Sequence, residues 1–244
     1  SLSNYTDNVY LFPMDDFLTS EALAISPELS YNRMETLNSI LDKPGIIITN
    51  LMGYLRFLPT KENYKSSFIE LSIGNTFNPQ LLVEKLIQTG YTRDTIVNKT
   101  GEYAVRGFII DVFPIESDYP VRIEFFDDEI DSIRYFNPDS QKSLEKLSSV
   151  VIGPCSEFIT NKLVDENHIG KQKFLPQYGD VSSILNYVEP SFTFFKDYEQ
   201  LKVSFSQIME EVSTYQSTKD VDFHGNYMFD FFDLQPDFPI YYMN

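Results

Sequence analysis

Hydrophobic and polar residues alternate most regularly in residues 101–136. Three runs in this stretch have a period of two, which is typical of strands with one buried face: Glu102–Phe113, Val121–Phe126 and Glu129–Phe136. Only Asp127-Asp128 separates the last two runs, which predicts a tight hairpin in which one aspartate has a positive φ. The pattern therefore predicts three or four antiparallel strands with one face in the core.

The strict alternation in Val121–Phe126 divides this strand into two faces. One face consists of residues that fit a core, namely Val121, Ile123 and Phe125. The other face consists of Arg122, Glu124 and Phe126. The pattern therefore predicts an outward phenylalanine beside an arginine, which is unusual on a sheet face that only meets water.

A second arginine belongs to the same predicted surface. Arg106 ends the preceding run next to Gly107, where the missing side chain allows a bulge or a close neighbour. In the simplest pairing of the strands, Arg106, Arg122 and Phe126 form one exposed cluster, whose composition is typical of a protein–protein hot spot. The alternative is an ordinary solvated sheet face, on which single arginines contribute little.

The segments on either side of this sheet predict an α/β layer. Gly45–Asn50 is a continuous β-branched run, which is typical of a strand buried on both faces of a parallel sheet, and a helical pattern precedes it. Asp197–Tyr215 has the spacing of an amphipathic helix, and residues 191–196 and 239–243 predict strands. The aromatic segment 227–238 is expected to pack on this layer rather than to bind a partner.

Charge and cysteine content narrow the function further. The 244 residues carry a formal net charge of −17, which repels phosphates, so we expect no strong binding of DNA by this chain alone. Isolated arginines on an acidic body suit a local contact with an acidic partner. The single cysteine, Cys155, fits a small semi-buried apolar position in a cytoplasmic protein. No apolar run approaches 18 residues and no signal peptide is visible, so no membrane contact is expected.

Motifs for nucleotide and metal chemistry are missing from the sequence. No G-x-x-x-x-G-K-[ST] pattern is present, so neither ATP nor another cofactor is expected in this chain, and no catalytic residue is predicted. The acidic residues of 127–131 suggest a magnesium site, but adjacent carboxylates in a turn diverge, so we favour a solvated turn. His168 and His224 lie too far apart for a metal-ligand motif, and no metal site is predicted.

Two stretches carry a family resemblance: GEYAVRGFIIDVFP and VRIEFFDDEIDSIRYFNPDSQKS. They resemble the second domain of the UvrB-like module of bacterial transcription-repair coupling factors, and UvrB has a related pattern. The resemblance is specific over Asn63–Ser156. It implies binding of UvrA through the arginine of the Arg-Gly pair, the arginine of the Arg-x-Glu-Phe-Phe strand and its second phenylalanine. These positions are Arg106, Arg122 and Phe126, and we add Glu124 and Arg134 as neighbours.

The resemblance also implies an architecture. It is a degenerate RecA-like or P-loop-like α/β layer domain, into which a small α+β domain with an antiparallel sheet and one helix is inserted. The first part of the layer is expected at residues 1–64, the inserted domain at 65–155 and the return to the layer at 156–244. Within the inserted domain, Asn78 and Pro79 predict the helix start and Gly90 its end.

The function implied by the resemblance is that of a non-catalytic adaptor. It would bind UvrA and recruit nucleotide-excision repair to stalled RNA polymerase. The parent protein would be an ATP-dependent translocase on double-stranded DNA, using ATP and magnesium in a downstream motor. The alternatives are a diverged nucleotide- or DNA-binding UvrB-like domain acting in repair and a metal-dependent nuclease.

Overall fold

The computed structural model describes residues 8–22, 26–41, 43, 45–188, 192–234, 236 and 239–243. Contacts among these residues divide the chain into two compact units. Glu62–Ile159 forms one, which we call the inserted unit. The segments up to Lys61 and from Thr160 form the other, which we call the split unit. Helix α4 (Lys61–Ser66) begins at the boundary between them.

The split unit contains short strands and helices from both ends of the chain. Before residue 62 these are β1 (Val9–Phe12), α1 (Phe17–Ala22), α2 (Pro27–Ile40), β2 (Ile46–Thr49), α3 (Leu51–Tyr54) and β3 (Leu58–Pro59). After residue 159 they are η2 (Gln172–Phe174), α6 (Leu175–Tyr178), β12 (Val181–Ser182), η3 (Ile184–Tyr187), β13 (Thr193–Lys196), α7 (Tyr198–Thr218) and β14 (Ile240–Met243). Strand β12 pairs with β3, so the two segments share a small antiparallel sheet.

Strands β1 and β2 pair in parallel, with helix α2 between them in the chain. The helix is fixed to the first strand by Thr36, whose hydroxyl donates to the carbonyl of Leu11 at 2.5 Å. The prediction that the second strand is buried on both faces is wrong, because Ile46 and Ile48 are 38% and 42% exposed. That face of β2 is therefore only partly covered by the described residues.

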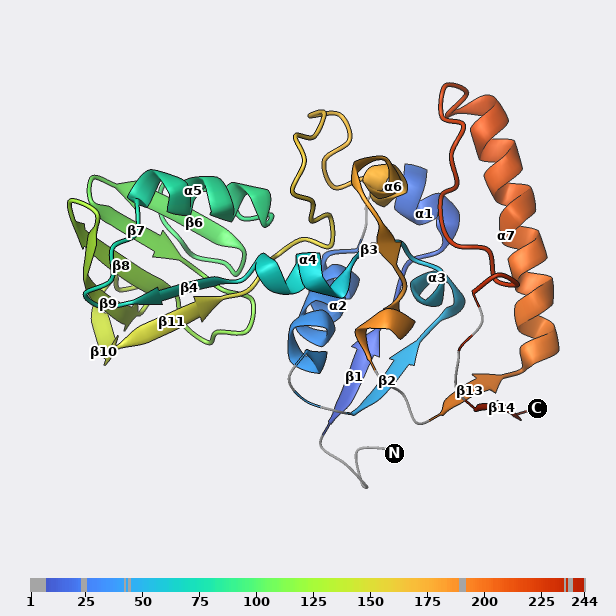
Figure 1. Cartoon of the computed structure of the whole chain (residues 1–244), viewed down its shortest axis with the longest axis horizontal. Helices are drawn as coiled ribbons and strands as arrows, with labels where there is room; N and C mark the ends of the chain where they lie inside the picture. The colour runs from blue at the N-terminus through green and yellow to red at the C-terminus, as the bar shows by residue number, and fades with distance from the viewer. Residues whose placement is uncertain are drawn as a thin grey trace. The chain divides into compact units, whose positions relative to one another are not determined.

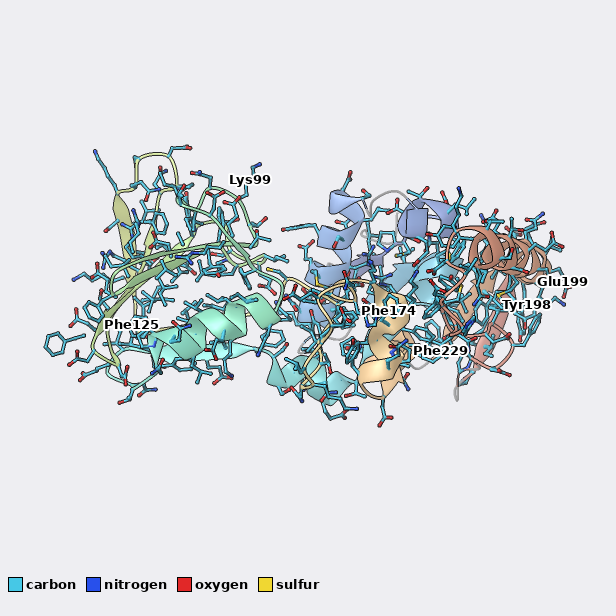
Figure 2. The ribbon with its side chains drawn as sticks, turned by 90° about the horizontal axis from the view of Figure 1, so that it is seen from above. Lys99, Phe125, Phe174, Tyr198, Glu199 and Phe229 are labelled. Atoms are coloured by element: carbon cyan, nitrogen blue, oxygen red, sulfur yellow. The ribbon has the colours of Figure 1, made fainter. Side chains whose placement is uncertain are left out.

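An aromatic core holds the split unit together. Tyr227, Met228 and Phe231 are buried in it, which confirms the expected packing for this part of the aromatic segment. Phe195 of β13 and Phe205 of α7 belong to the same core. Figure 2 labels three more aromatic residues from the second segment of the split unit: Phe174, Tyr198 and Phe229. The unit is thus packed mainly by aromatic rings from its second segment.

The inserted unit is built on a six-stranded sheet (Figure 1). Its elements are β4 (Ile69–Ser72), α5 (Pro79–Gln88), β5 (Thr92–Arg93), β6 (Glu102–Arg106), β7 (Ile109–Val112), β8 (Val121–Phe126), β9 (Glu129–Phe136), β10 (Ser143–Leu147) and β11 (Ser149–Ile152). The strand order is β10-β9-β8-β7-β6-β5, and every neighbouring pair except β5–β6 is antiparallel. Strands β4 and β11 form a separate antiparallel pair.

One face of the six-stranded sheet forms the main core of the inserted unit. Leu82 and Leu86 of α5 pack in one buried cluster with Ile110 and Ile123 of the sheet, and Ile69 of β4 belongs to the same cluster. Helix α5 therefore covers this face together with the β4–β11 pair (Figure 1). The opposite face of the sheet is left for other contacts.

The ends of α5 agree with the sequence prediction. The side-chain oxygen of Asn78 accepts hydrogen bonds from the backbone N–H groups of Gln80 and Leu81 at 2.8 and 3.1 Å. Pro79 occupies the first turn, where its missing N–H costs nothing. Gly90 follows the helix with a φ of 94°, a conformation that favours glycine. The predicted cap, start and end are confirmed.

Strands β8 and β9 form the predicted hairpin, with one irregularity. Asp127 in the turn has a φ of 52°, as expected for one of the two aspartates. Glu124 pairs with Ser132 and Phe125 with Ile130, so Asp131 is an extra residue in β9. Such a bulge shifts the alternation of one strand only. It lets Ile130 and Ile133 both face the core, although their spacing in sequence is three.

The lone cysteine, Cys155, lies at the margin of the inserted core. It packs against the buried cluster, and its backbone N–H donates to the carbonyl of Thr89 at 2.8 Å. Burial raises the pKa of the thiol to about 12. The prediction of a small semi-buried residue is confirmed. The molecule as a whole is a mixed α/β protein with several sheets, and none of its described helices is long and apolar enough to cross a membrane.

Candidate partner-binding surface

The sheet of the inserted unit has a polar face opposite its main core. The strand pairings place Asp111 of β7 directly beside Arg122 of β8, and Arg122 directly beside Arg134 of β9. The next outward residue of β8, Glu124, pairs with Ser132. We use the name polar face for the following set: Arg106, Asp111, Arg122, Glu124, Phe126 and Arg134. All five residues that the sequence predicted for the site belong to it.

Asp111 binds two of the three arginines. Its carboxylate accepts from Arg122 at both oxygens, with Nε to Oδ1 at 2.7 Å and Nη2 to Oδ2 at 2.8 Å. The Nη2 group of Arg106 donates to the same Oδ2. The Asp111 side chain is only 2% exposed, so this carboxylate is a buried anion that is neutralised by two cations.

Arg122 is covered, which corrects the expectation that it is exposed. Its side chain is 11% exposed and its guanidinium lies 4.3 Å from the ring centre of Phe136. Phe136 belongs to a second, small buried cluster with Val97, Ala104 and Phe113. Alternation along β8 placed Arg122 on the correct face but gave no sign of the contacts that Phe136 and Gln141 make with it.

Arg134 forms a separate pair with Glu124. Its Nη1 donates to Glu124 Oε2 at 2.8 Å and Nη2 donates to Oε1, so the two groups are joined through both oxygens. Hydrogen bonding from Arg134 lowers the pKa of the Glu124 carboxyl to about 2, and Ser132 adds to the effect. Two arginines stand opposite each other on neighbouring strands because each has its own carboxylate.

Phe126 and Arg106 are the exposed members of the polar face. Phe126 is 74% exposed, although it is a large apolar residue at the end of β8. The side chain of Arg106 is 45% exposed, and Asp111 is its one hydrogen-bond partner within the described part of the chain. Arg106 keeps its other N–H groups available. It pairs with Ile109 of β7, which pairs with Glu124 of β8, so Phe126 lies on the same face two residues further along β8.

Gly107 makes the hairpin between β6 and β7 but does not form a bulge. It has a φ of 62°, a backbone conformation that residues other than glycine rarely adopt. A Cβ atom added there would meet nothing within 4 Å, so the expected close neighbour is also absent among the described residues. The glycine is needed for the backbone conformation that turns the chain directly after Arg106.

Two residues of this site were missed by the sequence analysis. Asp111 looked like an ordinary polar position inside an apolar run. Its register beside Arg122 was the signal that could have identified it. The other is Gln141, whose Oε1 accepts from Arg122 Nη2 at 3.0 Å. Gln141 has a φ of 58° in the loop before β10, and no sequence pattern places that loop over the sheet.

The acidic residues of the β8–β9 turn were the candidate for a metal site in the inserted unit. Asp127 and Asp128 are exposed at the tip of the β8–β9 hairpin, as a solvated turn requires. Among the described residues, no group of three or more histidine, cysteine, aspartate or glutamate side chains is placed to hold a metal ion.

Comparison with known proteins places this surface in a family. The model of the UvrB interaction domain family matches residues 69–158. The chain is 40% identical over 153 residues to the transcription-repair-coupling factor of Bacillus subtilis. It is 31% identical over 201 residues to that of Staphylococcus epidermidis and 35% identical over 159 residues to that of Staphylococcus aureus.

These alignments cover much of this chain but little of the relatives. They span 62%, 80% and 65% of the chain, and 13%, 17% and 14% of the respective relatives. The family match includes every residue of the polar face. The resemblance found from the sequence is therefore confirmed. Residues 69–158 match the UvrB interaction domain family, and the chain that carries them is homologous to one part of the transcription-repair-coupling factors.

Proposed function

We propose that this chain is a non-catalytic adaptor that binds UvrA through the polar face of its inserted unit. The relatives are named for coupling transcription to repair, and the matched family is named for a UvrB interaction. On this proposal, the adaptor recruits nucleotide-excision repair to RNA polymerase that has stalled. The contact residues are Phe126 and Arg106, with Glu124 and Arg134 beside them and Arg122 beneath.

One observation carries the proposal. Phe126 is 74% exposed at the edge of a polar face where the neighbouring charged groups are paired. A phenylalanine that is mostly exposed adds little to the stability of the isolated domain, whereas aromatic residues and arginines are frequent binding hot spots. The charge of the chain adds a second argument, because a body with a net charge of −17 has little affinity for nucleic acid and a protein partner remains.

The first prediction concerns Phe126. Replacement by alanine removes the exposed ring without touching the core. We expect binding to UvrA to weaken by about 2 kcal/mol or more, which is typical of an aromatic hot spot. Isothermal titration calorimetry with the 244-residue chain and purified UvrA measures this directly. Thermal unfolding is expected to change little, because the ring packs on nothing that would be lost.

Ile87 provides a matched control. It is 57% exposed and lies on α5, which packs on the other face of the sheet. Ile87→Ala removes a similar exposed apolar surface and is expected to leave UvrA binding unchanged. If Phe126→Ala binds as tightly as the unmodified chain, the polar face is not the UvrA contact. Equal losses in both variants would point to a general apolar effect and also contradict the proposal.

The wider setting is part of the same proposal. We infer that the parent protein is a cytoplasmic ATP-dependent translocase on double-stranded DNA, with ATP and magnesium bound by downstream domains. We further infer that the split unit is a degenerate RecA-like layer. The parallel β1–β2 pair with α2 between its strands supports this, since such β-α-β units build layer folds. Direct, salt-sensitive binding of duplex DNA to this chain would favour the alternative of a DNA-binding repair domain.

A further inference from the structure

The polar face contains one buried carboxylate, that of Asp111, and the half-exposed Arg106 is bound to it. Asp111 is 2% exposed at its side chain and binds both Arg106 and Arg122. A buried carboxylate is costly unless cations and hydrogen bonds compensate it, so its geometry is strongly fixed by these two partners. Arg122 is fixed in turn by Phe136 beneath it and by Gln141 beside it.

The charges of this group do not cancel. Arg106 and Arg122 bring two positive charges, and Asp111 brings one negative charge. Arg122 is 11% exposed and its Nε and Nη2 groups already donate to Asp111 and Gln141. Arg106 is 45% exposed and only Nη2 is engaged within the described residues. The excess positive charge is therefore presented to solvent by Arg106.

We propose that Asp111 is the positioning residue of the UvrA contact, and that Arg122 acts through it rather than by touching the partner. The proposal rests on the function proposed above. Asp111 holds the Nη2 group of Arg106, while the half-exposed guanidinium has no other hydrogen-bond partner among the described residues, on the same face of the sheet as Phe126. Arg122 orients the carboxylate that does this. The partner group that matches is a carboxylate of UvrA, which accepts from the free edge of Arg106 while an apolar pocket receives Phe126.

A lysine cannot fill this double role, although it keeps the charge. A guanidinium has five N–H donors in a planar fork, so one edge binds Asp111 while another binds a partner. An ammonium group is a compact point charge, and Asp111 would hold it at the surface of the sheet. The geometry therefore predicts that Arg106→Lys behaves like Arg106→Ala in UvrA binding.

A double-mutant cycle on the 244-residue chain tests the positioning role. We expect Asp111→Asn to weaken UvrA binding about tenfold or more in the parent chain. In the Arg106→Ala background we expect the same change to cost less than about twofold, because the group that it positions is gone. Equal costs in both backgrounds would overturn the proposal, since they would mean that Asp111 acts only by supporting the fold.

NMR of the same variants tests directly whether Asp111 holds the Arg106 guanidinium in the free chain. With Asp111 in place, the Nη groups of Arg106 are held unequally and are expected to give separate ¹⁵N signals, assigned by their loss in Arg106→Lys. In Asp111→Asn these signals are expected to average. Unchanged Arg106 signals in a folded Asp111→Asn chain would contradict the proposal.

The outcomes separate this inference from the proposed function. If Phe126→Ala leaves UvrA affinity unchanged, the proposed function fails at this site. If Phe126→Ala weakens binding while Asp111→Asn does not, only the positioning role fails. Should Asp111→Asn not fold, Arg106→Lys decides, because Arg106 is half-exposed and outside the core. Full affinity in Arg106→Lys would overturn the proposed geometry, and a loss equal to that of Arg106→Ala would support it.

Discussion

At the scale of single residues, the polar face is ordered by two carboxylates: Asp111 binds Arg106 and Arg122, and Glu124 binds Arg134. Arg122 and Arg134 are direct cross-strand neighbours, a placement that destabilises a sheet when the charges are left unpaired. Arg122 leans to Asp111 and Arg134 leans to Glu124, so two ion pairs form side by side. The arrangement keeps three cations on one small face of an acidic protein.

The Glu124–Arg134 pair gives a prediction about pH. The pKa of Glu124 is lowered to about 2 in the folded chain, mainly by hydrogen bonding from Arg134, from 4.5 for an unperturbed glutamate. The stabilisation from this carboxyl is therefore present above about pH 4.5 and is lost as the pH falls towards 2. Because both side chains reach solvent, we expect about 1 kcal/mol of the free energy of unfolding to be lost in this range.

Urea unfolding between pH 2 and pH 6 measures this effect. The Glu124→Gln variant, which cannot titrate at this position, is expected to lose less stability over the same range than the unmodified chain. Parallel curves for the two proteins would show that the ion pair makes no net contribution.

At the scale of elements, helix α5 fixes the sheet from its core side. Leu82 and Leu86 are fully buried against the strands. The helix begins at Asn78, whose side-chain oxygen accepts hydrogen bonds from two backbone N–H groups. One face of the six-stranded sheet therefore provides the main core, and its other face carries the polar face and one small buried cluster. The polar face is stable without a partner for this reason.

The cap of α5 gives a stability prediction. Asn78→Ala removes the side-chain oxygen that accepts from two backbone N–H groups, so we expect the free energy of unfolding of the inserted unit to fall by about 1 kcal/mol. Asn98→Ala is the matched control, since its side chain makes one long hydrogen bond, of 3.4 Å, in an exposed loop. Thermal unfolding of both variants provides the measurement. A loss as large in Asn98→Ala would show that the cap itself is not responsible.

Sequence patterns predicted these elements well where the physics is local. Alternation identified β8 and β9, and the residues Asn78, Pro79 and Gly90 identified α5, because caps and turns depend on a few adjacent residues. The patterns failed where distant segments meet. The exposure of Ile46 depends on which strands pair with β2, and the burial of Arg122 depends on Phe136 of β9 and on the loop that carries Gln141. Asp111 was overlooked because its role comes from register, which alternation along one strand does not reveal.

At the scale of the whole molecule, the chain consists of two units with different kinds of core. The inserted unit is packed by aliphatic side chains against one sheet, whereas the split unit is packed by aromatic rings. Within the split unit, Lys173 joins elements that are far apart in sequence. Its ammonium group lies 3.0 Å from Glu21 of α1 and 2.6 Å from Asp220, which follows α7.

Lys173 gives a prediction that separates the two units. Its side chain is 7% exposed; burial alone would lower its pKa, but Asp220 and Glu21 raise it above the ordinary value. Lys173→Met leaves two carboxylates without their cation, so we expect the split unit to lose about 3 kcal/mol. UvrA binding is expected to be unchanged, because the polar face belongs to the other unit. Calorimetric unfolding together with UvrA titration measures both effects.

Lys202 is the matched control for this change. It also pairs with a carboxylate and lies over a tyrosine ring, but its partner Glu199 is 80% exposed at its side chain. Lys202→Met is expected to change stability by less than about 0.5 kcal/mol. A comparable loss in Lys202→Met would contradict the special role of Lys173.

The partly buried thiol of Cys155 is a natural probe of how the inserted unit opens. Because the sequence has a single cysteine, every labelling event with a maleimide takes place at this position. A thiol that packs against the core and whose pKa is raised to about 12 is expected to react slowly in the folded unit and faster when the surrounding structure opens. The labelling rate therefore records how often this unit opens, with no engineered probe, in the unmodified chain and in each variant alike.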